Sequence, residues 1–145
     1  MTGKHRIACQ HCGGLVGVPA DRLRDGPRCP RCHTPLFEGE PVELTESTFD
    51  RHVGDGDLPV VVDFWAPWCA PCRAMAPAYA EAARRIEPAA RFGKLNTDEA
   101  QSVAGRYGIR SIPTLIVFKG GREVARHSGA MGADALARWV ATALG

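Results

Sequence analysis

The sequence lacks the features that mark several large classes of protein. It has no apolar run near the ~18 residues that a membrane-spanning helix needs, and 18 Lys and Arg against 16 Asp and Glu leave a net charge of only +2. Nucleic-acid-binding proteins usually carry a concentrated basic surface, so we expect neither a nucleic acid nor a membrane as partner. The N-terminus, MTGKHRIACQHC, has polar and metal-ligating residues where a signal peptide has its apolar stretch. We therefore expect a cytoplasmic protein.

What the sequence does have is six cysteines, arranged as three C-x-x-C pairs. The pairs are Cys9 with Cys12, Cys29 with Cys32, and Cys69 with Cys72. Thiols in the cytosol are normally kept reduced, so these cysteines indicate metal or redox chemistry rather than a disulfide scaffold. The first two pairs lie in one polar stretch, whereas the third follows an apolar, β-branched run. We expect two separate sites.

The composition changes near Pro41. Residues 1–40 contain few large apolar side chains, and so short a segment seldom folds unaided. From Pro41 onward, apolar strand-like runs alternate with Ala-rich helical runs, which is typical of an α/β domain. We expect a small N-terminal domain at residues 1–40 and an α/β domain at residues 41–145.

The α/β part predicts the element order β-α-β-α-β-α-β-β-α. Strands are expected at 41–44, 58–65, 92–96, 115–118 and 123–127, and helices at 47–52, 69–86, 97–106 and 133–144. The continuous Val60-Val61-Val62 run indicates a central strand covered on both faces. Thr97 is expected to cap the third helix, and Gly120-Gly121 indicates a hairpin. His52 and His127 are expected at the surface.

Cys69-Ala70-Pro71-Cys72 stands where a buried strand leads into a helix. Unpaired N–H groups and the helix dipole favour a thiolate there, so Cys69 is predicted to be the nucleophile. Pro71 in the first turn does not destabilise the helix, because the N–H that proline lacks would have had no partner there. Cys72 lies on the same side of the helix and can resolve a mixed disulfide. This pattern predicts dithiol-disulfide exchange.

The first two pairs have the spacing C-x2-C-x16-C-x2-C, which is typical of a four-cysteine zinc site. Cys9, Cys12, Cys29 and Cys32 are thus the expected ligands of one structural zinc ion. Zinc coordination would also supply folding free energy that the apolar content cannot. Two alternatives stay open: one or both pairs are further redox dithiols, or a histidine replaces a cysteine as ligand. The candidate histidines are His5, His11 and His33.

The stretches VVVDFWAPWCAPC, KLNTDE and YGIRSIPTLIVFKGG, with the late Ser128-Gly129-Ala130, resemble the thioredoxin family over residues 41–145. With its N-terminal cysteines, the whole chain resembles the zinc-containing bacterial members, the thioredoxin 2 type. The resemblance implies a thioredoxin fold, in which helices flank a central mixed β-sheet, with a small zinc-ribbon-like N-terminal domain. It implies a monomeric protein-disulfide reductase without an organic cofactor. The implied partners are proteins with disulfides and an NADPH-dependent thioredoxin reductase.

The resemblance also assigns roles to single residues. It implies that Asp63 is the buried acid that takes the proton from the resolving cysteine, with Lys94 beside it. A carboxyl in an apolar strand has a raised pKa, which suits this role, although a buried structural ion pair is the alternative. Ala70 departs from the commonest family motif, which has glycine there, and this puts the reduction potential in doubt.

The same resemblance implies a binding surface for client proteins around the disulfide. The implied residues are Trp68, Ile112, Pro113 and Gly129, with a cis peptide bond before Pro113. The alternative for Trp68 is packing alone. Two other functions remain open: a thiol oxidase or isomerase on the same fold, and a zinc-ribbon module that binds a partner, in a redox-sensing role, with the α/β part as its scaffold.

Overall fold

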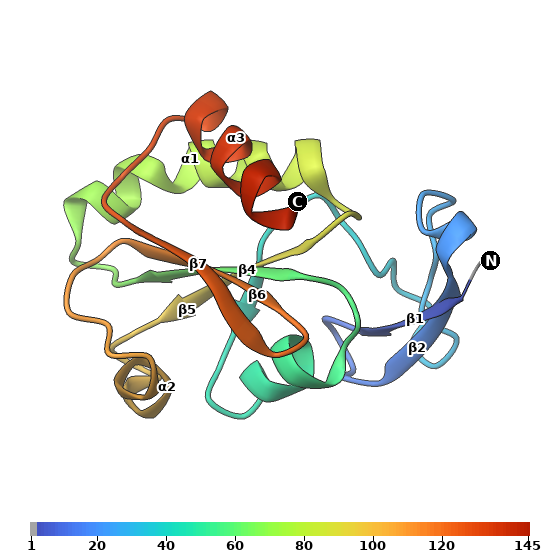
Figure 1. Ribbon diagram of the computed structural model, residues 1–145. Coiled ribbons are helices and arrows are strands. Elements are labelled where there is room, and N and C mark those ends of the chain that lie inside the picture. Colours follow the sequence, from blue (N-terminus) through green and yellow to red (C-terminus); the bar gives the residue numbers. More distant parts are fainter. Residues whose placement is uncertain (1–2) are drawn as a thin grey trace.

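The computed structural model describes residues 3–145, which form two β-sheets and the helices around them (Figure 1). The elements are β1 (Lys4–Ala8), β2 (Leu15–Pro19), the 3-10 turn η1 (Ala20–Arg22), β3 (Val42–Leu44), the π-helical turn η2 (Arg51–Asp55), β4 (Val60–Trp65), α1 (Ala70–Ile86), β5 (Arg91–Asn96), α2 (Gln101–Arg106), β6 (Thr114–Lys119), β7 (Arg122–Ser128) and α3 (Ala133–Leu144). From β3 onward this order confirms the predicted one. Among residues 3–145, no helix is long and apolar enough to cross a membrane.

The larger sheet has five strands in the order β3-β5-β4-β6-β7. Strands β3, β5 and β4 are parallel, while β6 and β7 run antiparallel, so the sheet is mixed. Helices α1 and α3 cover one face, and α2 with η2 covers the other (Figure 1). Val61 of β4 packs toward α1 and α3, and Val62 packs toward α2 and η2. The prediction of a central strand covered on both faces is confirmed.

Helix α2 begins differently from the prediction. Thr97 does not cap it: the N-cap is Ala100, and the Thr97 hydroxyl donates to the carbonyl of Trp65 at 3.1 Å. The carboxylate of Glu46 instead accepts from the backbone N–H groups of Ser102 and Val103, at 2.7 and 3.3 Å. The helix therefore takes its cap from a loop far away in the sequence.

The segment after β3 also differs from the prediction. The helix expected at 47–52 is shifted along the chain: residues 46–48 form a turn, and the helical residues 49 and 50 continue into η2, which ends at Asp55. His52 was expected at the surface, and that prediction was wrong: its side chain is buried, with 6% of its surface exposed. The cause is strand β1, which lies against η2 and covers His52. His127 on β7 is only partly exposed, beside Trp139.

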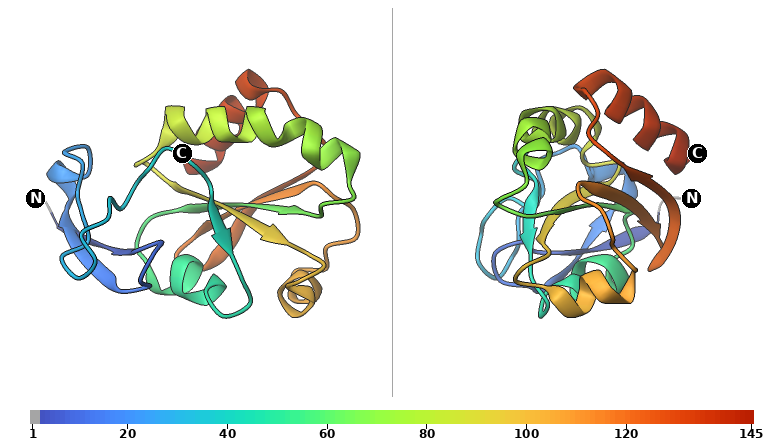
Figure 2. Two further views of the ribbon diagram at one scale, coloured as in Figure 1. Left: turned by 180° about the vertical axis from the view of Figure 1, so that it is seen from behind. Right: turned by 90° about the vertical axis from the view of Figure 1, so that its left-hand side faces the viewer.

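The N-terminal segment forms the antiparallel pair β1 and β2, followed by an irregular stretch up to β3. It lies at the end of the large sheet where β4 and β5 begin (Figure 2). The Arg6 backbone N–H donates to the Asp57 carboxylate at 2.7 Å, and the Asp57 N–H donates to the Arg6 carbonyl at 2.8 Å. Leu58 is buried with Ile7 and Leu36. The third cysteine pair follows the opposite end of β4 (Figure 1).

Candidate active site and metal centre

Cys69 and Cys72 form a disulfide at the start of α1. Cys69 is the N-cap residue, and its sulfur accepts the backbone N–H of Cys72 at 3.2 Å. Pro71 occupies the first turn, where it leaves no helix hydrogen bond unmade. After reduction, the free N–H groups and the dipole of α1 would stabilise a thiolate on Cys69. The local structure therefore favours Cys69 as the nucleophile.

The disulfide lies in a small apolar site. Cys69 and Cys72 have 4% and 2% of their surface exposed, and they pack with Ala66, Trp65 and Ile112. The Cys69 sulfur lies 3.7 Å from the carbonyl oxygen of Ile112. The loop that leads into β6 thus passes beside the Cys69 sulfur.

The peptide bond between Ile112 and Pro113 is cis, which confirms the prediction. The Pro113 carbonyl accepts the backbone N–H of Gly129 at 2.9 Å. Gly129 has a φ of 106°, a conformation that side-chain-bearing residues rarely adopt. The structure therefore brings Ile112, Pro113 and Gly129 together next to Cys69.

Asp63 is buried in β4, with 1% of its surface exposed. Neither of its carboxylate oxygens has a hydrogen-bond partner among residues 3–145. Burial raises the pKa of Asp63 to about 7, and the positive charge of Lys94 opposes this rise only in part. A carboxyl with this pKa can exchange a proton near neutral pH.

Lys94 lies on β5 in register with Asp63. Its Nζ lies over the ring of Trp65, 4.4 Å from the ring centroid. Within the described part of the chain no ion pair joins Lys94 to Asp63. The alternative of a buried structural ion pair therefore has no support in the geometry.

Trp68 is the most exposed large apolar side chain near the disulfide, with 67% of its surface exposed. Its indole N–H donates to the carboxylate of Asp98 at 2.9 Å. Packing alone does not explain an aromatic ring that faces solvent and is held at one edge by a hydrogen bond. No local pattern in the sequence places Asp98 at this site, because it lies 30 positions from Trp68.

The other four cysteines gather into one cluster in the N-terminal segment. The sulfur atoms of Cys9, Cys12, Cys29 and Cys32 all lie within 4.8 Å of one another. The Cys9–Cys32 and Cys12–Cys29 sulfur distances are both 3.6 Å, and none of the four is in a disulfide. Four sulfurs around a tetrahedral zinc ion at ~2.3 Å would be about 3.8 Å apart. The donor set fits a zinc ion.

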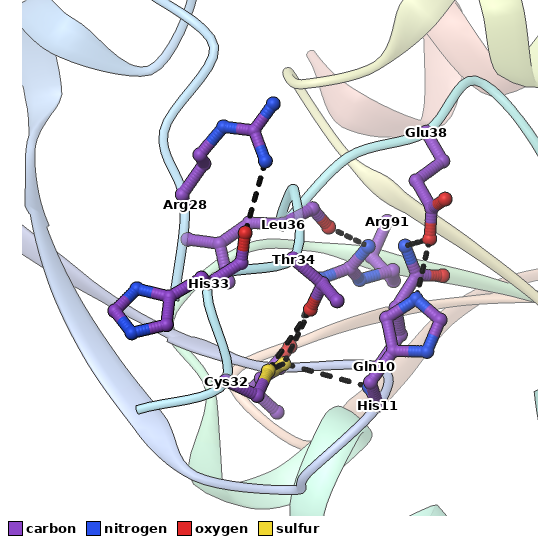
Figure 3. Close-up of polar contacts among 11 residues, drawn as sticks. Gln10, His11, Arg28, Cys32, His33, Thr34, Leu36, Glu38 and Arg91 are labelled. Atoms are coloured by element: carbon purple, nitrogen blue, oxygen red, sulfur yellow. Dashed lines mark hydrogen bonds and ion pairs between the residues drawn. The ribbon is translucent and has the colours of Figure 1, made fainter. Parts of the chain in front are cut away.

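No histidine joins this cluster among residues 3–145. His11 Nε2 lies 2.6 Å from the carboxylate of Glu38, which also accepts from the amide of Gln10 at 2.6 Å (Figure 3). These contacts link the loop of the first cysteine pair to the segment after the second pair. The His11 ring thus contacts Glu38 and positions the loop, while the backbone N–H of His11 donates to the Cys9 sulfur at 3.4 Å.

Two residues around the cluster were missed by the sequence analysis. The Thr34 hydroxyl lies 3.0 Å from the Cys32 sulfur and 3.7 Å from the Cys9 sulfur (Figure 3). A hydroxyl two positions after a ligand cysteine is a signal that the sequence did contain. The second residue is Arg91, whose guanidinium reaches the segment from β5. Its separation in sequence left no such signal.

The sequence matches the family model described as Thioredoxin over residues 40–142. It is 40% identical to Thioredoxin C-3 of Corynebacterium nephridii over 134 residues, which is 92% of each chain. It is 54% identical to Thioredoxin 1 of a Nostoc species over 61% of this chain and 83% of the relative. It is 42% identical to the chloroplastic Thioredoxin M-type of Chlamydomonas reinhardtii over 80% of this chain and 85% of the relative.

Proposed function

The chain belongs to the thioredoxin family and is a protein-disulfide reductase, and we propose that it reduces client disulfides through Cys69 and Cys72. The observation that carries this proposal is the Cys69–Cys72 disulfide at the start of α1, with the Cys72 N–H directed at the Cys69 sulfur. The same N–H stabilises the thiolate that forms on reduction.

In the proposed reaction, the reduced protein attacks with the Cys69 thiolate. A bond forms between Cys69 and one client sulfur, and the other client sulfur leaves as a thiolate. Cys72 then attacks the Cys69 sulfur, which releases the first client sulfur and forms the Cys69–Cys72 disulfide. The client disulfide gains two electrons, and the two cysteines of this chain lose them.

Asp63 is proposed to take the proton that Cys72 must lose before it attacks. Its support is the pKa of about 7, caused by burial, together with the absence of a hydrogen-bond partner for its carboxylate within residues 3–145. A carboxyl without competing donors is free to accept that proton. Lys94 is proposed to limit the rise of this pKa through its positive charge.

Client segments are proposed to lie in an extended conformation across Trp68, Ile112, Pro113 and Gly129. The support is the exposure of Trp68 and the position of Ile112 beside the Cys69 sulfur. An aromatic ring that is already held in place loses little conformational entropy when a client binds.

The disulfide left on this chain must be reduced again. We propose an NADPH-dependent thioredoxin reductase as the electron donor, no bound organic cofactor, and a monomer as the working unit. The cytoplasm suits this proposal, because its reductants would keep the four N-terminal cysteines out of disulfides and so able to bind zinc.

We propose that residues 1–40 are a zinc-binding domain and residues 41–145 the thioredoxin domain. Cys9, Cys12, Cys29 and Cys32 would hold one structural zinc ion, and the support is the grouping of their sulfurs. Four cysteines leave no open coordination position for a substrate, so the ion would supply folding free energy rather than chemistry.

Two measurements test these proposals. The reduction of insulin disulfides should fall to the uncatalysed rate in Cys69→Ser, whereas the control Val124→Ala, at an exposed position on β7 outside both cysteine sites, should keep the activity. Full activity in Cys69→Ser would overturn the mechanism.

Native mass spectrometry followed by thiol alkylation should find one zinc ion and a single disulfide, between Cys69 and Cys72. A protein without zinc and with three interchanging disulfides would overturn the zinc proposal and indicate a thiol relay.

A further inference from the structure

Arg91 is the first residue of β5, and its side chain leaves the thioredoxin domain to enter the N-terminal segment. The side chain is buried, with only 3% of the residue exposed. Its guanidinium donates to the carbonyl of Leu36 at 2.7 Å (Figure 3) and to that of Ala8 at 2.9 Å. It also lies over the ring of Phe37, 4.7 Å from the ring centroid. Three contacts thus hold one buried cation in place.

In the sequence, the two carbonyls belong to residues on either side of the four cysteines. Ala8 directly precedes Cys9, and Leu36 follows Cys32 by four positions. Since one guanidinium bonds both carbonyls, it fixes the distance between the strand that leads into the first cysteine pair and the segment that leaves the second. Groups that hold metal ligands in place typically affect metal affinity strongly.

The charge of Arg91 also lacks a direct partner. No carboxylate within residues 3–145 forms an ion pair with it. Burial lowers its pKa, and the charges that oppose this effect belong to Glu87, Cys9 and Glu38. A buried cation is costly unless a negative charge compensates it. Four thiolates around one zinc ion carry a net charge of about −2, which is complementary to this guanidinium.

We propose that Arg91 is a positioning residue of the zinc site, through which the thioredoxin domain holds the four cysteines ready for the ion. This inference rests on the zinc site proposed above. Without the guanidinium, the Ala8 and Leu36 carbonyls lose their donors, and the thiolate cluster loses a buried positive charge. Because coupling between two events is reciprocal, zinc binding also strengthens the attachment of the N-terminal segment to β5.

The test is the zinc affinity of the full reduced chain, measured by competition with a chromophoric chelator. Arg91→Met should bind zinc roughly 10- to 100-fold more weakly than the unmodified protein. Arg91→Lys keeps the charge but loses the paired donors, so it should lie in between. Arg110→Met is the matched control, because Arg110 is exposed and lies on the loop before Pro113. Its affinity should stay within about twofold, since it lacks contact with the site.

Substitution of cobalt for zinc adds a readout that a purely structural role would not change. Arg91→Met should shift the visible absorption bands of the bound Co²⁺, because the ligand geometry changes, whereas Arg110→Met should not. Arg91→Lys serves as the informative variant if Arg91→Met fails to fold. Affinities of both Arg91 variants within twofold of the control, or weaker binding with unchanged cobalt spectra, would overturn the proposal. A failure of the unmodified chain to bind zinc would overturn the zinc site itself.

Discussion

Lys94 lies opposite Asp63 on the neighbouring strand, but its ammonium rests over the ring of Trp65 instead of on the carboxylate. Asp63 is therefore buried without a hydrogen bond or an ion pair among the described residues. A carboxylate in such surroundings favours the protonated form, which explains why its pKa rises to about 7. The first prediction follows from this arrangement.

Asp63→Asn should change how stability depends on pH. The folded pKa of about 7 is higher than the ordinary value of 3.8, so the folded state holds an extra proton between these values. Stability should therefore fall as pH rises from about 4 to 7, by up to roughly 4 kcal/mol. Asn carries no charge, so the variant should lack this fall and be more stable above pH 7.

Chemical unfolding of the oxidised protein at a series of pH values measures this difference. Glu87→Gln is the matched control, because burial also raises the pKa of Glu87 to about 7. Glu87→Gln should remove the loss of stability that Glu87 causes as pH rises, and it should leave the loss caused by Asp63. The prediction would be contradicted if the free energy of unfolding changed with pH in Asp63→Asn as it does in the unmodified protein.

His52 should contribute a loss of stability in acid, opposite in sign to the effect of Asp63. Burial first, and then the charges of Arg91 and Arg51, lower the pKa of His52 from 6.5 to about 4. The unfolded chain therefore binds a proton at His52 between these values while the folded chain does not, and stability is lost as pH falls from about 6.5 to 4.

The unfolding free energy at pH 5 minus that at pH 7.5 should be roughly 2 kcal/mol larger in His52→Gln than in the unmodified protein, because the variant lacks the loss caused by His52. The measurement is the difference between unfolding free energies at the two pH values. This difference cancels any constant cost of the altered packing. The control is His127→Gln, which replaces a partly exposed side chain on β7 and should leave this difference unchanged. An equal change in both variants would refute the role given to His52.

Trp68→Ala should impair the reduction of protein clients. A central aromatic contact at an interface is commonly worth more than about 1 kcal/mol, so kcat/KM for a protein disulfide should fall roughly 10-fold. The rate with a small soluble disulfide should hardly change, because the Cys69 thiolate is unaltered. Val124→Ala is the control, since Val124 is the other exposed large apolar residue among residues 3–145, with 48% of its surface exposed. Equal losses for both substrates would show that Trp68 acts on the thiols instead of on clients.

Glu46→Ala should destabilise α2. The Ser102 and Val103 N–H groups would lose their acceptor, at a cost of about 1 kcal/mol in the free energy of unfolding. Glu46→Gln keeps an oxygen in the same place and should lose less than half as much. Hydrogen exchange at the first turn of α2 measures the effect directly. Unchanged exchange in Glu46→Ala would show that this cap is dispensable.

Much of the fold could be predicted from local patterns. The Val60-Val61-Val62 run identified the central strand, and Gly120-Gly121 identified the hairpin between β6 and β7. The ends of α3 were predicted to the residue. Errors occurred where distant segments meet: β1 covers His52, and Glu46 replaces Thr97 as the source of the α2 cap.

The candidate sites divide in the same way. The spacing of the cysteines in the sequence was enough to separate a redox pair from a four-cysteine cluster, because ligand and thiol chemistry depends on neighbours two or three positions apart. The sequence could not indicate that Trp68 bonds Asp98, or that Lys94 lies on Trp65 and leaves Asp63 alone. Those contacts depend on which strands pair and in what register.

The sequence by itself determined the family, the strand and helix order, and the identity of the cysteines, since each is written in short motifs and local periodicity. Only the tertiary structure decided what surrounds those cysteines. Arg91 meets Ala8 across 83 positions and Leu36 across 55, and no local preference encodes such a meeting. Burial and charge compensation arise when the two segments pack together, so the pKa of Asp63 and the surroundings of the four-cysteine cluster are properties of the folded chain.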